Sequence, residues 1–244
     1  MLPEIDSISL QHQYIWQQKP SLRIVYEEMY ARIGKECRSG RTLEIGGGIG
    51  NFKDYWPGTI NLDIQSLPWT DTVADAHLLP FVDGSFDNIV VIDTLHHLVR
   101  PIRFFREAKR VLKSTGRLVI VEPMISPLSH FFYNRFHPEP VDMLDAPLED
   151  GPLDPNRQPF DSNQAIPTIL FLRQRKKFEK YFPEFTILLC KGFGLFAYPL
   201  SGGFRPWTGL PVFLAPLLLC FERRVEGLLA PTMGFRMIVT LEKI

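Results

Sequence analysis

The sequence predicts an α/β fold in which a mostly parallel sheet carries helices on both faces. Thr42 to Ile45 is a short apolar and β-branched segment that ends in a cluster of glycines, which is typical of a buried strand before a tight turn. Residues 86–93 and 117–122 are further strand segments, apolar through their middles. Residues 101–113 between them carry apolar side chains at helical spacing. Strand and helix therefore alternate, which favours parallel pairing.

Length and composition fit one domain spanning residues 1–244. The chain is 45% hydrophobic, which is enough for a sizeable core, and its 27 basic and 27 acidic side chains leave a formal net charge of zero. Such a balance gives no overall field to attract nucleic acid. The three cysteines are widely spaced, so we expect no disulfide framework, no metal site and a reducing, cytoplasmic location. The first six residues do not resemble a signal peptide.

The spacing of the glycines restricts the class of ligand that the turn can bind. A dinucleotide-binding turn has the pattern G-x-G-x-x-G, which would need a third glycine where this chain has Asn51. The residues present are Glu44, Gly46, Gly48 and Gly50, which form E-x-G-x-G-x-G. A strand, glycine turn and helix in this order present backbone N–H groups that can meet a nucleotide-like ligand. The alternative is a tight turn without a ligand.

Residues 7–36 show helical spacing that is interrupted near Pro20. We expect residues 1–40 to form a helical cap. In the functional interpretation the cap closes over a ligand, with Tyr14 and Trp16 lining the site; in the alternative it only covers the sheet.

An acidic residue ends the second predicted strand, residues 59–64. Ligands bind beyond the C-terminal ends of parallel strands, and a carboxylate there can accept hydrogen bonds from both hydroxyls of a ribose. Asp63 follows the first motif glycine, Gly46, by 63 − 46 = 17 residues, close to the ~20 expected for such an acid. Its alternative role is a helix cap or loop residue. The third predicted strand, residues 72–76, ends in Asp75 and Ala76.

Residues 44–122 resemble the class I S-adenosylmethionine-dependent methyltransferases, in the small-molecule branch similar to methyltransferase type 11. The motifs that carry the resemblance are the glycine turn from Glu44, Asp63, Asp75-Ala76, Leu95-His96-His97-Leu98 and the segment Arg110-Val111-Leu112-Lys113-x-x-Gly116-Arg117-Leu118. They occur in the family's order and spacing. The chain departs from the pattern at Thr115, where a second glycine is usual.

The resemblance implies a Rossmann-like sheet of seven strands, with an antiparallel last strand and helical or loop insertions in the C-terminal third. It implies a cofactor-binding core at residues 41–122, substrate-binding insertions and closing strands at residues 123–244, and S-adenosylmethionine as cofactor. By this resemblance, Glu44 and the glycines of the turn hold the methionine part of the cofactor. Asp63 holds its ribose, and Asp75 holds its adenine. The implied contact residues are Glu44, Gly46, Gly48, Gly50, Asp63, Ile64, Asp75, Ala76 and Asp93.

His96 and His97 follow the fourth predicted strand, where the acceptor should meet the methyl group. Histidine titrates near neutrality and suits proton removal from a hydroxyl. We predict that one of the two is the catalytic base, with His97 placed ahead of His96, and that the other packs or caps the following helix. His137, beside Glu139, is a weaker candidate.

Three segments in the C-terminal third indicate how the acceptor could be bound. Residues 137–167 are rich in Pro, Asp and Asn and predict a lid or a mobile loop. Residues 168–182 predict a basic helix, and residues 207–221 form the most apolar segment, too short and too interrupted by proline to span a membrane. The bland interpretation of that segment is a core helix on the sheet. The functional one is a wall for a hydrophobic or lipid-linked acceptor, with peripheral contact at the inner membrane surface.

The sequence therefore predicts methyl transfer to a small-molecule acceptor rather than to nucleic acid. A non-catalytic methyltransferase-like binding subunit is the main alternative. A nucleotide-dependent oxidoreductase is a weaker one, because the glycine spacing fails the dinucleotide pattern. The acceptor's identity, the methylated atom and the oligomeric state stay open.

Overall fold

The computed structural model describes residues 7–152, 158 and 161–244. The segment used to argue against a signal peptide, residues 1–6, lies outside the described residues. So do residues 153–157 and 159–160 of the predicted lid.

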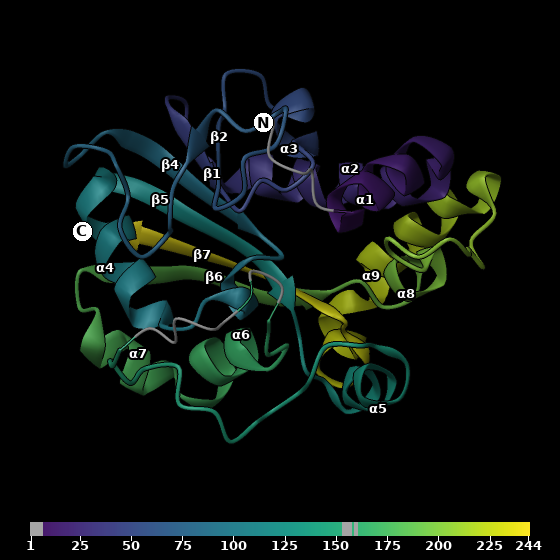
Figure 1. Cartoon of the computed structure of the whole chain (residues 1–244). Helices are drawn as coiled ribbons and strands as arrows, with labels where there is room; N and C mark the ends of the chain where they lie inside the picture. Colours follow the sequence, from purple (N-terminus) through teal and green to yellow (C-terminus); the bar gives the residue numbers. More distant parts are fainter. Residues whose placement is uncertain (1–6, 153–157, 159–160) are drawn as a thin grey trace.

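A seven-stranded sheet forms the centre of the molecule (Figure 1). The strand order is β3-β2-β1-β4-β5-β7-β6, and every neighbouring pair is parallel except the two that β7 makes. The strands are β1 (Thr42–Ile45), β2 (Ile60–Asp63), β3 (Thr72–Val73), β4 (Phe86–Ile92), β5 (Leu112–Pro123), β6 (Phe185–Phe193) and β7 (Arg236–Lys243). The predicted seven-stranded, mostly parallel sheet with an antiparallel last strand is confirmed.

Helical segments connect the strands and continue beyond them. They are α1 (Ser7–Gln18), α2 (Pro20–Glu36), α3 (Asn51–Tyr55), η1 (Leu95–His97), α4 (Pro101–Val111), α5 (Pro127–Phe136), α6 (Ile166–Thr168), η2 (Ile169–Arg173), α7 (Arg175–Tyr181), α8 (Ala197–Ser201), η3 (Val212–Leu214) and α9 (Ala215–Met233). Pro20 occupies the first turn of α2, where its missing N–H costs no hydrogen bond. This explains the predicted interruption near that residue.

Different helices cover the two faces of the sheet. Successive side chains of a strand point to opposite faces, so Ile89 and Val91 of β4 join a cluster with Phe105 of α4. Val90 joins the opposite cluster with Met29 of α2. All three β4 residues are fully buried, which is why this strand is a continuous apolar run.

The order of the strands creates a crevice beside the C-terminal end of β1. The chain continues from β1 to β2 on one side, whereas β4 pairs with the other side of β1. Helices on the two sides of such a reversal leave a gap where ligands bind. The glycine turn follows β1 at this point.

The start of β5 differs from the prediction. We expected a turn at residues 114–116 before the strand, but the strand already begins at Leu112 and its register with β4 shifts in this segment. Thr115 has a φ of 61°, a conformation that favours glycine. Thr115, where the resembled family usually has a second glycine, thus has a left-handed backbone.

The apolar segment 207–221 is buried only in part: Leu210, Ala215 and Leu219 belong to a core cluster, which agrees with the core interpretation for these residues. It continues into α9, where Phe213 before the helix is 75% exposed and Leu217 within it is 67% exposed. The same helix buries Glu222 and Glu226. No helix among the described residues is both long and apolar enough to cross a membrane.

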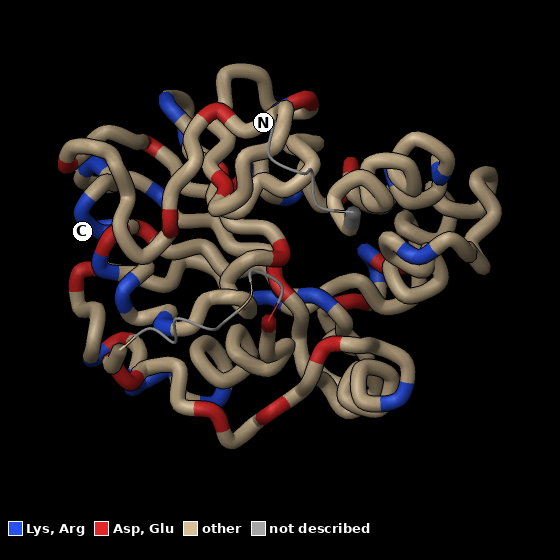
Figure 2. The backbone as a smooth tube through the Cα atoms, in the orientation of Figure 1, with Lys and Arg blue, Asp and Glu red and all other residues tan. Residues whose placement is uncertain are grey.

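The basic and apolar segments of the C-terminal third lie apart. Figure 1 shows α7 at the lower left of the molecule and α9 at the right. The basic and apolar segments are thus not adjacent in the fold. Figure 2 shows acidic and basic residues interspersed along the chain, in keeping with its zero net charge.

Candidate active site

The glycine turn begins with a residue that no other type could replace. Gly46 has a φ of 67°, and its backbone N–H donates to the Leu62 carbonyl at 2.8 Å. An added Cβ would lie 2.2 Å from Thr94 Oγ1. The turn after β1 is thereby held against β2 and the segment after β4.

Gly48 differs because the space above it is open. Its φ is 48°, and the nearest atom to an added Cβ would be a backbone oxygen at 4.0 Å. Its N–H donates to Asp63 Oδ2 at 3.0 Å, and the other carboxylate oxygen accepts from the Gln65 N–H at 2.9 Å. Each oxygen retains accepting capacity. The structure thus joins the predicted ribose acid to the glycine turn.

Glu44 is a buried carboxyl group beside this turn. It is 3% exposed, and its Oε2 has no hydrogen-bond partner among the described residues. Burial, and then the nearby charge of Asp63, raise the pKa of Glu44 to about 8. A cationic ligand group would supply the counterion that the described residues near it lack.

One cavity of about 470 Å³ connects these residues with the predicted catalytic pair. Eight of the nine predicted cofactor contacts line it. The exception is Gly50, which caps α3 with a φ of 75° and packs near Trp69. Its role is in the turn rather than at the cavity surface.

The helical cap contributes to the cavity through residues other than those predicted. Ser9 and His12 of α1 line it. Tyr14 is 65% exposed, and neither Tyr14 nor Trp16 lines the cavity, so that expectation is wrong. Trp16 packs instead against Tyr26 and Phe204. The helical spacing located the cap but not which face of α1 looks inward.

A buried glutamate orients His96. The His96 Nδ1 atom lies 2.5 Å from Glu122 Oε2. Glu122 ends the apolar part of β5 and is fully buried, and its other oxygen accepts from the backbone N–H groups of Thr94 and Leu95 at 2.7 and 2.6 Å. The turn after β4 and the His96 ring are therefore fixed by the same carboxylate. A charged residue closing an apolar strand was the only sequence signal for it.

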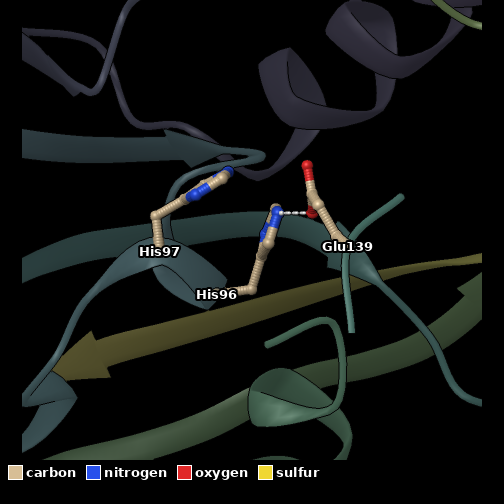
Figure 3. Close-up of side chains that lie close together, drawn as sticks. All are labelled: His96, His97 and Glu139. Carbon is tan, nitrogen blue, oxygen red and sulfur yellow. Dashed lines mark ion pairs between the residues drawn. The ribbon is translucent and has the colours of Figure 1, made fainter. Parts of the chain in front are cut away.

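A second carboxylate faces the other ring nitrogen of His96. Glu139 Oε2 lies 3.2 Å from His96 Nε2, and His97 lies beside this pair (Figure 3). Burial alone would lower the pKa of His96, but Glu122 and Glu139 outweigh it and raise the pKa to about 10. Burial opposes the ionisation of Glu139 as well, yet the His96 charge holds the pKa of Glu139 well below its ordinary value. His96 is therefore an imidazolium at neutral pH.

His97 has the opposite character. Burial, and then the charge of His96, lower its pKa to about 4. Its Nδ1 lies 3.3 Å from the Asp161 carbonyl oxygen, which can only accept a hydrogen bond. Of the two histidines, only His97 is unprotonated near pH 7, although its lowered pKa makes it a weak base.

Parts of the predicted lid pack over the histidines. The Asn163 N–H donates to the His96 carbonyl at 2.9 Å, and the Gln164 side-chain amide donates to Glu139. His137 lines the cavity, and its Nδ1 accepts from the Glu139 N–H at 3.3 Å. The described lid residues thus position Glu139.

Sequence reasoning missed a buried arginine at the floor of the cavity. Arg236, at the start of β7, is 1% exposed and forms an ion pair with Asp93 at 2.5 Å. Its guanidinium also lies 4.8 Å from the ring centre of Tyr198. Its Nε and Nη2 atoms have no hydrogen-bond partner among the described residues. An arginine within the apolar segment 235–241 was the available signal.

Comparisons with known proteins agree with this architecture. Residues 43–120 match the family model described as a methyltransferase domain. An uncharacterized protein of Methanocaldococcus jannaschii is 30% identical over 105 residues, which are 40% of this chain and 51% of that protein. A demethylmenaquinone methyltransferase of Paenarthrobacter aurescens is 31% identical over 114 residues, 41% of this chain and 43% of that protein. The chain thus spans about half the length of these relatives.

The fold is shared over nearly the whole chain with solved structures. A S-adenosylmethionine-dependent methyltransferase of Thermotoga maritima has a TM-score of 0.54 at 17% identity, covering 92% of this chain and 91% of that one. A second one, of Archaeoglobus fulgidus, has a TM-score of 0.53 at 16% identity and covers 90% of this chain and 93% of that one. The match at residues 43–120 shows a methyltransferase domain, and the strand order is that of the fold shared with these solved S-adenosylmethionine-dependent methyltransferases.

Proposed function

We propose that the protein transfers a methyl group from S-adenosylmethionine to a small-molecule acceptor. The observation that carries this proposal is that one cavity joins the glycine turn and Asp63 to the polar cluster of His96, His97 and Glu139. S-adenosylmethionine supplies an electrophilic methyl group on a sulfonium, which the acceptor displaces in line. The chain's own contribution is then mainly to position the two reactants.

The residues present fit the cofactor. The open space above Gly48 lets a ligand approach the backbone closely. Asp63 offers carboxylate oxygens to ribose hydroxyls, and the unpartnered carboxyl group of Glu44 suits a cationic amino group. A cavity of about 470 Å³ lies within the roughly 300–1,000 Å³ of ligand pockets. Asp75 and Ala76 line the same cavity and would contact the adenine.

The acceptor would meet the methyl group at the other end of the cavity. There the cluster of His96, His97 and Glu139 assists loss of the acceptor's proton. His97 is the member with an unprotonated ring at neutral pH, and the acceptor would have to bind close to it for so weak a base to act. His96→Ala and His97→Ala should therefore each reduce turnover at saturating cofactor. Wild-type turnover in both variants would refute a role for the cluster.

Calorimetric titration of S-adenosylmethionine and S-adenosylhomocysteine tests the cofactor site. Asp63→Ala should weaken binding because ribose hydroxyls lose a charged acceptor, worth about 1.5–3 kcal/mol per bond. Gly48→Val should weaken it because the side chain fills the open space and strains a left-handed backbone. Unchanged affinity in both variants would refute the assignment. Labelled cofactor with a cell extract then separates an enzyme, which leaves label on a product, from a binding subunit.

We further infer that the acceptor is hydrophobic or lipid-linked. Among the relatives is a protein named as a demethylmenaquinone methyltransferase, which supports an apolar acceptor of related kind. Apolar side chains exposed on α5, η3 and α9 support it independently. This α5–α9 surface is defined by Phe131, Phe136, Phe213, Leu217 and Phe221, each at least half exposed. Helix α5 also supplies Tyr133 to the cavity wall, so the helix that carries two of these side chains borders the cavity.

A further inference from the structure

The polar cluster at the acceptor end has the geometry of a metal site. The donor atoms of His96, His97 and Glu139 all lie within 4.8 Å of one another. Metal–ligand bonds of about 2.0–2.2 Å place neighbouring ligands of a tetrahedral or octahedral ion roughly 3.0–3.4 Å apart. The 3.2 Å between His96 Nε2 and Glu139 Oε2 already has this value. Figure 3 shows the three side chains converging on one space.

The orientation of both imidazole rings fits metal binding. Metal-bound histidines usually donate from their other ring nitrogen to a carboxylate or a backbone carbonyl. The Nδ1 of His96 contacts Glu122, and the Nδ1 of His97 contacts the Asp161 carbonyl. In both rings this leaves Nε2 as the atom that can act as a ligand. Two independent anchors of this kind fix the ring positions before any ion arrives.

The local charge favours a cation here. Asp93, Glu122 and Glu139 carry carboxylates around His96, and Arg236 is ion-paired with Asp93. A metal ion between His96 Nε2 and Glu139 would bring a positive charge next to these carboxylates, two of which contact the His96 ring.

A second set of donors, Asp93, His96 and Glu122, is also close together. It is less suited to an ion because Glu122 already accepts three hydrogen bonds and Asp93 is committed to Arg236. Its member Glu122 does not line the cavity, whereas all three residues of the first set do. The first set is therefore the one that could bind an ion together with an acceptor.

We propose that His96, His97 and Glu139 bind one divalent first-row transition-metal ion, such as Zn²⁺, at the acceptor end of the cavity. Two imidazoles and one carboxylate suit such ions better than Mg²⁺ or Ca²⁺, and three protein ligands leave a position open. The open position would take a hydroxyl or carbonyl oxygen of the acceptor. With the ion bound, His97 would be a ligand rather than the base, and the metal would favour proton loss from a bound hydroxyl. This last assignment rests on the proposed function, since it takes this end of the cavity as the acceptor's.

The metal-free protein, prepared with a chelator and dialysed, is titrated with Zn²⁺ by calorimetry and with Co²⁺ by visible absorption. We expect one ion per chain and the Co²⁺ bands of a site with nitrogen ligands, while Mg²⁺ gives neither. Glu139→Gln and His97→Ala should each weaken Zn²⁺ binding at least tenfold. His130→Ala removes an exposed histidine of α5 as the matched control and should leave binding unchanged.

S-adenosylhomocysteine binding, measured on every variant, shows that the fold and the cofactor end are intact. With that binding preserved, equal Zn²⁺ affinity in wild type and the double variant His97→Ala/Glu139→Gln would overturn the proposal. Zn²⁺ binding that is lost in His130→Ala would also overturn it, because the ion would then be held at the surface. Either result leaves methyl transfer standing, since no acceptor or turnover enters the measurement.

Discussion

Asp93 has a left-handed backbone, with a φ of 51°, directly after β4. This conformation points its carboxylate at Arg236, which is otherwise enclosed by Tyr26, Tyr133 and Tyr198. Asparagine also tolerates a positive φ, so Asp93→Asn removes the charge without straining the backbone. Leaving a buried arginine without its partner should cost about 3 kcal/mol of unfolding free energy.

Urea unfolding followed by circular dichroism measures this loss. Asp54→Asn, at an exposed position of α3, is the control and should change the unfolding free energy by less than about 0.5 kcal/mol. Equal midpoints for the two variants would mean that Arg236 does not depend on Asp93.

Glu44 predicts a pH dependence of stability. Its pKa is about 8 in the fold, against an ordinary value of 4.5. The folded protein therefore keeps a proton that the unfolded chain releases, so this contribution to stability is full below pH 4.5 and is lost as pH rises through 8. Glu44→Gln cannot titrate. Its unfolding free energy should rise relative to wild type by roughly 3–4 kcal/mol between pH 5 and pH 8. Urea midpoints at these pH values check this; a constant difference contradicts it.

Helix α9 buries two glutamates and leaves several apolar side chains exposed. Glu222 accepts from the N–H groups of Phe196 and Ala197 at the start of α8. Glu226 pairs with Arg32 at 3.0 Å and with Lys191 at 2.7 Å. These contacts hold the helix to its neighbours together with the burial of residues such as Leu219.

Glu222→Ala should lower the unfolding free energy by about 1–3 kcal/mol, because two backbone N–H groups at the start of α8 lose their acceptor. Glu222→Gln keeps an amide oxygen there and should recover part of the loss. Leu217→Ala, at a 67% exposed position on the same helix, should be nearly neutral. Thermal or urea denaturation ranks the three; a larger loss for Leu217→Ala would show that the outer face is buried after all.

The sequence predicted the positions of the helices and strands well, but it predicted poorly which of their faces are exposed. The strands, the glycine turn and the amphipathic helix at residues 101–113 can be predicted from the spacing of apolar residues and glycines within a single segment. The outward face of α9 depends on partners elsewhere, such as Arg32 for Glu226. The same limit applies to α1, where Ser9 and His12, rather than Tyr14, line the cavity.

For the whole molecule, the α5–α9 surface predicts binding to membranes. The protein should float with anionic vesicles in a density gradient, and Phe213→Ser with Leu217→Ser should reduce the floating fraction several-fold. Val82→Ser, at a 78% exposed position in another part of the chain, should not. The test is run at low and high salt, because charge contacts weaken with salt and apolar contacts do not.

A protein that stays at the bottom of the gradient at both salt concentrations would remove membrane contact and leave a soluble apolar acceptor. Floating that is unchanged by the two serine substitutions would place the contact elsewhere on the molecule.

Only the proposed cofactor-binding half of the site could be predicted from the sequence. The residues proposed to contact the cofactor follow one another in the family's order, so a single chain segment identifies most of them. Arg236 reaches the cavity because β7 pairs with β5, where Pro123 lies opposite it. Glu139 reaches His96 through the packing of the lid residues. These contacts depend on strand register and on how the loops pack, and neither can be predicted from the spacing of residues along the chain.

The position of β7 between β5 and β6 also sets an order of assembly on the ribosome. The glycine turn and Asp93 emerge from the exit tunnel well before Arg236 has been synthesised. A nascent chain interrupted before β7 thus carries the whole recognisable motif, yet Asp93 has no guanidinium beside it and β5 lacks a neighbour. Completion of the cavity floor is in this sense a late step of biosynthesis.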